Sequence, residues 1–97
     1  MIVITYKTIK QYQDSNKHAK DALERWYHIV TIANWSNLSE IRETYNDVDF
    51  VGNDRYVFNI GGNKYRLVAM IHFSTRTVYV RFIGTHKEYD KIDCTTI

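Results

Sequence analysis

Two arginines and one histidine in the second half of the chain are the side chains best suited to chemistry on an anion. Arg66 and Arg81 each lie within a stretch rich in β-branched and aromatic residues, and His86 follows shortly after the second stretch. A guanidinium group binds phosphate oxygens through paired hydrogen bonds, and an imidazole can accept or release a proton near neutral pH. These side chains indicate a site for a polyanionic ligand, provided that the fold brings them together.

Residue alternation along the predicted strands places both arginines on one face of a β-sheet. The side chains of this second face are Asn59, Lys64, Arg66, Val68, Met70, His72, Tyr79, Arg81 and Ile83. The arginines lie on neighbouring strands with no acidic residue beside them, so they repel each other unless a polyanion shares their charge. The alternative is an ordinary solvated face, on which the stems of Lys and Arg cover Val68 and Met70.

The first face of the sheet carries no charge and is predicted to form the core beneath the helices. Its side chains are Tyr56, Phe58, Ile60, Tyr65, Leu67, Ala69, Ile71, Phe73, Val78, Val80 and Phe82. This register assumes a two-residue turn at Gly61 and Gly62 that pairs Ile60 with Asn63, and an even number of residues in the loop around 74–76. An odd number of residues in this loop would turn the following strand, residues 77–83, over and expose its apolar side chains. The hydrophobic pattern therefore favours the even number.

Helical periodicity and capping patterns account for most of the remaining chain. Ser15 or Asn16 can cap a helix with a regular apolar stripe, and Asn37 with Glu40 forms a capping-box pattern for a shorter helix. The apolar stripe consists of Ala19, Ala22, Leu23, Trp26, Ile29, Val30 and Ala33. We assign Trp26 to the core. In chain order we expect a strand at residues 2–6, helical turns at 7–13, the two helices, a loop at 46–54, strands at 56–60, 65–73 and 77–83, and a helix at 86–92.

These elements predict one α+β domain, residues 1–97. Helices cover one face of a small, mainly antiparallel sheet made of the N-terminal strand and a three-stranded meander, and a short helix ends the domain. The net charge of +2 permits an anionic partner without requiring one. A single cysteine, Cys94, excludes an internal disulfide and a thiolate zinc site. We find no signal-peptide pattern and no membrane-spanning run, and therefore expect a cytoplasmic protein without a cofactor or metal.

The predicted start of the last helix positions the histidine. Thr85 and Glu88 form a capping-box pattern, so a helix should begin near His86 and direct free N–H groups toward an anion. Tyr89 lies three residues further on, on the same side of this helix. His86 can act there as a general acid or base, although a histidine at a helix start is more often an ordinary surface residue.

Two segments resemble the HigB toxins of the RelE-like superfamily. Residues 56–68, YVFNIGGNKYRLV, resemble the central hairpin of that family, and residues 81–90, RFIGTHKEYD, resemble its strand-to-helix end with the pattern G-T-H-x-x-Y-D. Trp26 and Trp35 lie where the family has tryptophans. The resemblance covers nearly the whole chain, and the second motif is long and specific.

The resemblance implies a metal-independent endoribonuclease that cleaves translated mRNA in the ribosomal A site, through attack of the RNA 2′-hydroxyl on the adjacent phosphate. Arg66 and Arg81 would bind the phosphate and the transition state, and His86 would be the general acid or base. Tyr89 would orient the RNA or join proton transfer. Further RNA contacts are expected from Lys64, Asn59, Tyr79 and Lys87.

A HigA-like helix-turn-helix antitoxin is the partner that the resemblance implies, and DNA would be reached only through that complex. No membrane partner is expected. Two other functions stay open: a toxin of this fold that acts by protein binding, through gyrase inhibition or antitoxin-dependent repression, and an RNA-binding protein without toxicity. The retention of Arg66, Arg81 and His86 favours RNA cleavage.

Overall fold

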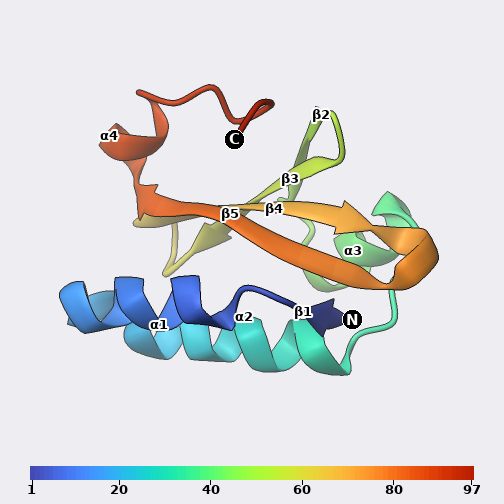
Figure 1. Ribbon diagram of the computed structural model, residues 1–97, viewed down its shortest axis with the longest axis horizontal. Helices are drawn as coiled ribbons and strands as arrows, with labels where there is room; N and C mark the ends of the chain where they lie inside the picture. The colour runs from blue at the N-terminus through green and yellow to red at the C-terminus, as the bar shows by residue number, and fades with distance from the viewer.

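The computed structural model describes all 97 residues and contains a five-stranded sheet in the order β1-β5-β4-β3-β2 (Figure 1). The strands are β1 (Ile2–Val3), β2 (Asp49–Gly52), β3 (Arg55–Ile60), β4 (Tyr65–His72) and β5 (Thr77–Thr85). β1 is parallel to β5, and the other neighbours are antiparallel. The predicted α+β fold is confirmed, with one strand more than predicted, because β2 lies within the segment 46–54 for which the sequence indicates a loop.

Two layers of helix lie on opposite sides of this sheet. The helices are α1 (Tyr6–Ser15), α2 (Lys20–Ile32), α3 (Leu38–Thr44) and α4 (His86–Tyr89), with 3-10 turns η1 (Lys17–Ala19) and η2 (Phe73–Thr75). Figure 1 shows α1 and α2 side by side beneath the sheet, whereas α4 and the C-terminal segment lie above it. None of these helices combines the length and the apolar composition that a bilayer crossing requires.

The uncharged face of the sheet packs against α2 and forms the core, as its sequence pattern predicts. Trp26 is 1% exposed and meets Phe58 edge-on, with 5.4 Å between the ring centroids. Trp35 and Tyr45 pack against the same phenylalanine. One aromatic side chain of β3 therefore contacts α2 and both segments that flank α3, and this fixes the helices against the sheet.

The turn between β3 and β4 is longer than the sequence suggests. Ile60 pairs with Tyr65 rather than with Asn63, which leaves a four-residue turn between the strands. Gly61, Gly62 and Asn63 have φ angles of 63°, 61° and 77°, a region that glycine enters freely and asparagine more readily than most residues. The predicted two-residue turn is wrong. The register shifts by two residues, so the side chains of β3 and β4 keep their predicted faces.

A β-bulge at Arg81 exchanges the faces at the end of β5. Val68 pairs with Phe82 while the next residue of β4 pairs with Val80, so Arg81 has no partner of its own. Beyond the bulge Phe82 shares the second face with Val68, and Ile83, which is 8% exposed, joins the core. The sequence predicts the reverse for these two residues, because strict alternation has no place for an extra residue.

Several smaller features of the prediction are settled by the structure. The loop between β4 and β5 has four residues, an even number as predicted. Asn37 caps α3 by accepting a hydrogen bond from the Glu40 N–H at 3.0 Å. Asn16 ends α1 instead of capping α2, which begins at Lys20 after η1 without a side-chain cap. β1 has two residues and α4 four, both fewer than predicted, whereas α1 has ten residues and is longer than predicted.

The second face of the sheet is partly covered by the C-terminal segment (Figure 1). The Arg55 Nε on β3 donates a hydrogen bond of 3.0 Å to the Ile97 carbonyl oxygen, which ties this segment to the sheet. On the same face, Val57 and Val68 are 4% and 0% exposed. The second face is thus neither a fully solvated surface nor a fully open cationic platform.

The packing of Trp26 generates a stability prediction. Trp26→Ala should lower the free energy of unfolding by about 3–5 kcal/mol, because it empties a fully enclosed position. Urea denaturation of the purified chain measures the change, and Ile32→Ala, at a side chain that is 72% exposed, should cost less than about 0.5 kcal/mol. Equal effects of the two substitutions would contradict the proposed core.

Candidate functional site

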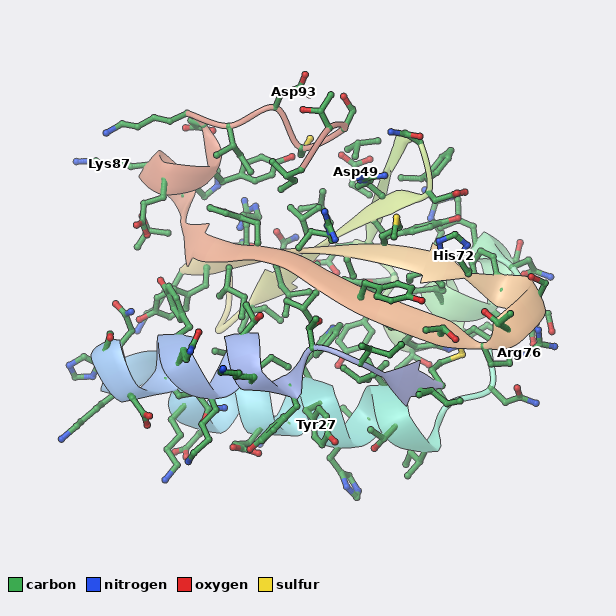
Figure 2. All side chains as sticks on the ribbon, in the orientation of Figure 1. Tyr27, Asp49, His72, Arg76, Lys87 and Asp93 are labelled. Carbon is green, nitrogen blue, oxygen red and sulfur yellow. The ribbon has the colours of Figure 1, made fainter.

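A cleft of about 470 Å³ opens on the second face, between α4 and β2 and above β3. The cleft is lined by Asn46, Asp47, Val48, Asp49, Val57, Asn59, Arg66, His86 and Tyr89. Its volume falls within the ~300–1,000 Å³ typical of small-molecule sites. The strand order places β3 as the floor, with β4 and α4 on one side and β2 on the other. Figure 2 labels Asp49 on the β2 side and Lys87 on α4.

Arg66 and His86, twenty residues apart in sequence, meet on the β4 side of the cleft. A guanidinium nitrogen of Arg66, Nη2, contacts Nε2 of His86. Because a guanidinium group can only donate hydrogen bonds, Nε2 of the histidine is the acceptor in this contact, and the ring carries its proton on Nδ1. The single lone pair of Nε2 is thus engaged by Arg66, and it becomes available to a ligand when the guanidinium group turns to a phosphate.

Gly84 explains why the histidine can reach this arginine. Gly84 is the residue paired with Arg66 across β4 and β5, two positions before His86. A Cβ atom on Gly84 would lie 2.5 Å from the Phe82 ring and 3.1 Å from the Glu88 Cβ. The missing side chain lets β5 turn directly into α4 over that ring, and a larger residue would force the ring to shift.

The predicted capping box holds the first turn of α4. The Thr85 N–H donates to the Glu88 Oε1 at 2.8 Å, and the Glu88 N–H donates to the Thr85 Oγ1 at 3.3 Å. These bonds satisfy backbone donors that a helix start leaves free. The helix that carries His86 and Tyr89 is thereby fixed in spite of its four residues.

Tyr89 lines the cleft from α4 as a proton donor. Its hydroxyl donates to the Cys94 Sγ at 3.4 Å. Burial raises the pKa of the Tyr89 phenol to about 12, and the hydrogen bond to Cys94 and the negative charge of Asp49 act in the same direction. The phenol therefore keeps its proton at physiological pH and can give it only to a strongly basic atom.

Two carboxylates on the opposite side of the cleft were not predicted as site residues. Asp47 and Asp49 come from the end of the α3–β2 connection and the start of β2. The Asn59 Nδ2, on the floor, donates to the Asp47 Oδ2 at 2.9 Å. Sequence reasoning reads this segment as a loop, and its Asn and Asp residues are equally typical of turns. Only the pairing of Asp49 with Val57 places the segment beside the cleft.

The structure brings Asn59, Arg66, His86 and Tyr89 together in this cleft, but not the other predicted residues. Arg81 is exposed at the β-bulge. Lys64 and Lys87 are exposed, and Figure 2 shows Lys87 pointing outward from α4. Tyr79 packs edge-on against His72, with 5.8 Å between ring centroids, toward the far end of the sheet.

The arrangement can bind an anion at Arg66, accept a proton at His86 and donate one from Tyr89. No three His, Cys, Asp or Glu side chains lie close enough together to hold a metal ion. The residues that line the cleft include no Ser, Thr or Cys.

The fold places the chain in the class of small RelE-like toxins. The chain belongs to the HigB toxin family, because the family model described as HigB toxin, RelE-like toxic component of a toxin–antitoxin system, matches residues 19–92. Membership in this family implies an antitoxin partner. The resemblance of the two sequence motifs to HigB toxins is thus confirmed.

Curated relatives agree with this assignment. The chain is 33% identical over 92 residues to the mRNA interferase toxin HigB of Escherichia coli (strain K12), an alignment that covers 93% of this chain and 88% of the relative. The mRNA interferase HigB of Shigella flexneri gives the same identity and coverage. The mRNA interferase HigB of Escherichia coli O6:H1 is 32% identical over 82 residues, or 80% of each chain.

The surroundings of Tyr89 generate a titration prediction. Because its pKa is raised to about 12, the phenol should be mostly neutral up to about pH 11 and half ionised near pH 12, whereas an unperturbed tyrosine is half ionised near pH 10. The difference between the tyrosinate absorbance of the wild type and that of Tyr89→Phe, followed against pH, isolates this group. A difference curve with its midpoint near 10 would show that the phenol is not held as described.

Proposed function

We propose that this chain is a ribosome-dependent mRNA endoribonuclease, the toxin of a type II toxin–antitoxin system. The contact between Arg66 and His86 inside the cleft is the observation that carries the proposal. A phosphate-binding group beside a proton acceptor is what RNA cleavage by the 2′-hydroxyl requires of a protein. The names of the relatives, all mRNA interferases, support the same activity.

In the proposed reaction, each step is carried out by one side chain of the cleft. When the scissile phosphate binds the Arg66 guanidinium group, Nε2 of His86 is released from Arg66 and accepts the proton of the 2′-hydroxyl, and the 2′-oxygen attacks the adjacent phosphorus. Arg66 neutralises the charge that develops on the phosphate oxygens. The bond from phosphorus to the 5′-oxygen breaks, and that oxygen takes a proton from the Tyr89 hydroxyl. The products are a 2′,3′-cyclic phosphate and a 5′-hydroxyl.

The raised pKa of Tyr89 favours this division of roles. A phenol with a pKa of about 12 is a poor base at physiological pH, because almost none of it is ionised. An alkoxide leaving group is more basic still, so proton transfer from the phenol to the departing oxygen is favourable. His86, with an acceptor nitrogen beside Arg66, is the better group to begin the reaction.

The predicted residues outside the cleft take a different part in the proposal. Arg81, Lys64 and Lys87 are exposed cations, and we assign them to RNA phosphates away from the cut, with Tyr79 as a further RNA contact. Asn59 would contact the RNA inside the cleft, which it lines. The sequence places Arg81 beside Arg66 at the transition state, whereas its position at the bulge, outside the cleft, suits a binding role better. Cleavage would take place in the A site of cytoplasmic ribosomes, and a HigA-like helix-turn-helix antitoxin would restrain it.

Substitution of Arg66 tests the proposal directly. Arg66→Ala should reduce mRNA cleavage by about 10²–10³-fold, because one transition-state donor group is removed. Arg66→Lys should also be impaired, since an ammonium group cannot make the bidentate contact. Primer extension on a translated reporter mRNA, after expression without antitoxin, measures the cuts. Arg42→Ala, which removes an exposed arginine on α3, is the matched control and should cleave normally.

Cuts that persist without translation would refute the dependence on ribosomes. Growth arrest with signs of DNA damage and no mRNA cuts would instead favour gyrase inhibition. RNA affinity without either effect would favour an RNA-binding protein that is not a toxin.

Arg81 should behave differently from Arg66. If Arg81 contacts an RNA phosphate outside the cleft, Arg81→Ala should weaken binding to ribosomes programmed with mRNA regardless of codon. It should also lower the dependence of binding on salt by about one unit of logarithmic slope. A series of binding measurements at increasing salt tests this. If Arg81→Ala lowered cleavage as much as Arg66→Ala and left binding unchanged, Arg81 would instead act on the transition state.

A further inference from the structure

We propose that Asp47 selects the nucleotide next to the cut, by accepting a hydrogen bond from an exocyclic amino group of its base, so that uracil is disfavoured there. The inference rests on the proposed function, since it concerns the RNA bound in the same cleft. It starts from the acidic side of that cleft, where Asp47 has no part in the cleavage chemistry.

The cleft separates positive and negative groups across the width of one strand. Arg66 and His86 stand on the β4 side of β3, and Asp47 and Asp49 stand on the β2 side. A phosphate is attracted to the first side and repelled by the second, because like charges placed together are costly. The RNA backbone therefore lies along Arg66, and what extends across the floor toward β2 is the base.

Asp47 is oriented for this contact. One of its carboxylate oxygens, Oδ2, accepts the hydrogen bond from the Asn59 Nδ2 at 2.9 Å. The other oxygen, Oδ1, remains free to accept. A carboxylate has no hydrogen to donate, and one of the two N–H groups of the Asn59 amide is taken up by Asp47, so at Oδ1 the cleft presents an acceptor.

The bases differ in how they meet such an edge. Unpaired bases are read on their Watson–Crick edges, where adenine, cytosine and guanine each carry an amino group. Acidic side chains accept hydrogen bonds from such amino groups. Uracil has two carbonyl oxygens on either side of a single N–H, and these oxygens would face the carboxylate. A carboxylate that accepts a hydrogen bond from this N–H is repelled by the oxygens on either side of it, so its bond to uracil is weaker than its bond to an amino group, which penalises uracil.

Asp49 is less suited to this role than Asp47. Its negative charge acts on the Tyr89 phenol on the other side of the cleft, and it belongs to β2 with a backbone partner in Val57. Asp47 precedes the strand and has only an amide as its side-chain partner. The selection of the base is therefore assigned to Asp47 alone.

Mapping of cleavage positions tests the inference. RNA 5′ ends are sequenced after brief expression of the wild type, Asp47→Asn and Asp47→Glu, and base frequencies at the two nucleotides flanking each cut are compared with those of the translated mRNA. In the wild type, uracil should be depleted about fivefold or more at one of these positions, as expected for one hydrogen bond weakened. Asp47→Asn keeps an oxygen for Asn59 and adds an N–H donor, so it should accept uracil. Asp47→Glu should retain the depletion.

The control is Asp21→Asn, which makes the same change of charge at an exposed position of α2. It should leave the base frequencies as in the wild type. A wild-type protein that cuts without depleting uracil at either position overturns the inference, and so does an Asp47→Asn protein with an unchanged pattern. Loss of all cuts in a folded Asp47→Asn protein would also overturn it, since Asp47 would then act in the chemistry. If the wild type makes no cuts, it is the proposed function that fails.

Discussion

The pairing of Arg66 on β4 with Gly84 on β5 is the constraint on which the candidate site depends. It fixes the arginine directly opposite the point where β5 turns into α4, and the absence of a side chain at Gly84 lets the Phe82 ring pass beneath that turn. His86 then follows within contact of the guanidinium group. A shift of the two strands by even one residue would turn Arg66 to the other face and separate the pair.

The two faces of the sheet have different roles, since one forms the core and the other carries the cleft. The first face is buried under α1 and α2 by an aromatic cluster centred on Phe58, and it supplies the rigidity of the domain. The second face is divided, because the C-terminal segment and α4 bury Val57 and Val68 and leave a cleft beside them. A cleft with a rigid floor can hold charged side chains close together, since the sheet beneath opposes their tendency to move apart.

The cleft carries both positive and negative side chains and is not a basic patch. The chain has a net charge of only +2, and the cleft itself pairs a cationic side with an acidic one. An RNA held by such a site is oriented by repulsion as well as by attraction. This arrangement is better suited to placing one phosphate and one base than to strong binding of any RNA, for which clustered cations would serve.

Local rules determined most of the elements and part of the site. The alternation of apolar residues identified the core face, and the capping patterns at Asn37 and Thr85 placed two helix starts correctly. The residues of the G-T-H motif were sufficient to indicate the family, and they singled out His86, which the structure places in the cleft. These features depend on neighbours within a few positions in sequence, and such neighbours interact in nearly the same way in any fold.

The tertiary structure alone decided which charged residues meet. The bulge removed Arg81 from the pattern of strict alternation, and the pairing of β2 with β3 brought Asp47 and Asp49 to the cleft from a segment that resembles a loop. Both outcomes depend on hydrogen bonds between strands whose registers are set by the packing of the whole core. A single extra residue changes a strand's face without changing its composition, so the sequence determined that a cationic site exists and the assembled sheet determined its members.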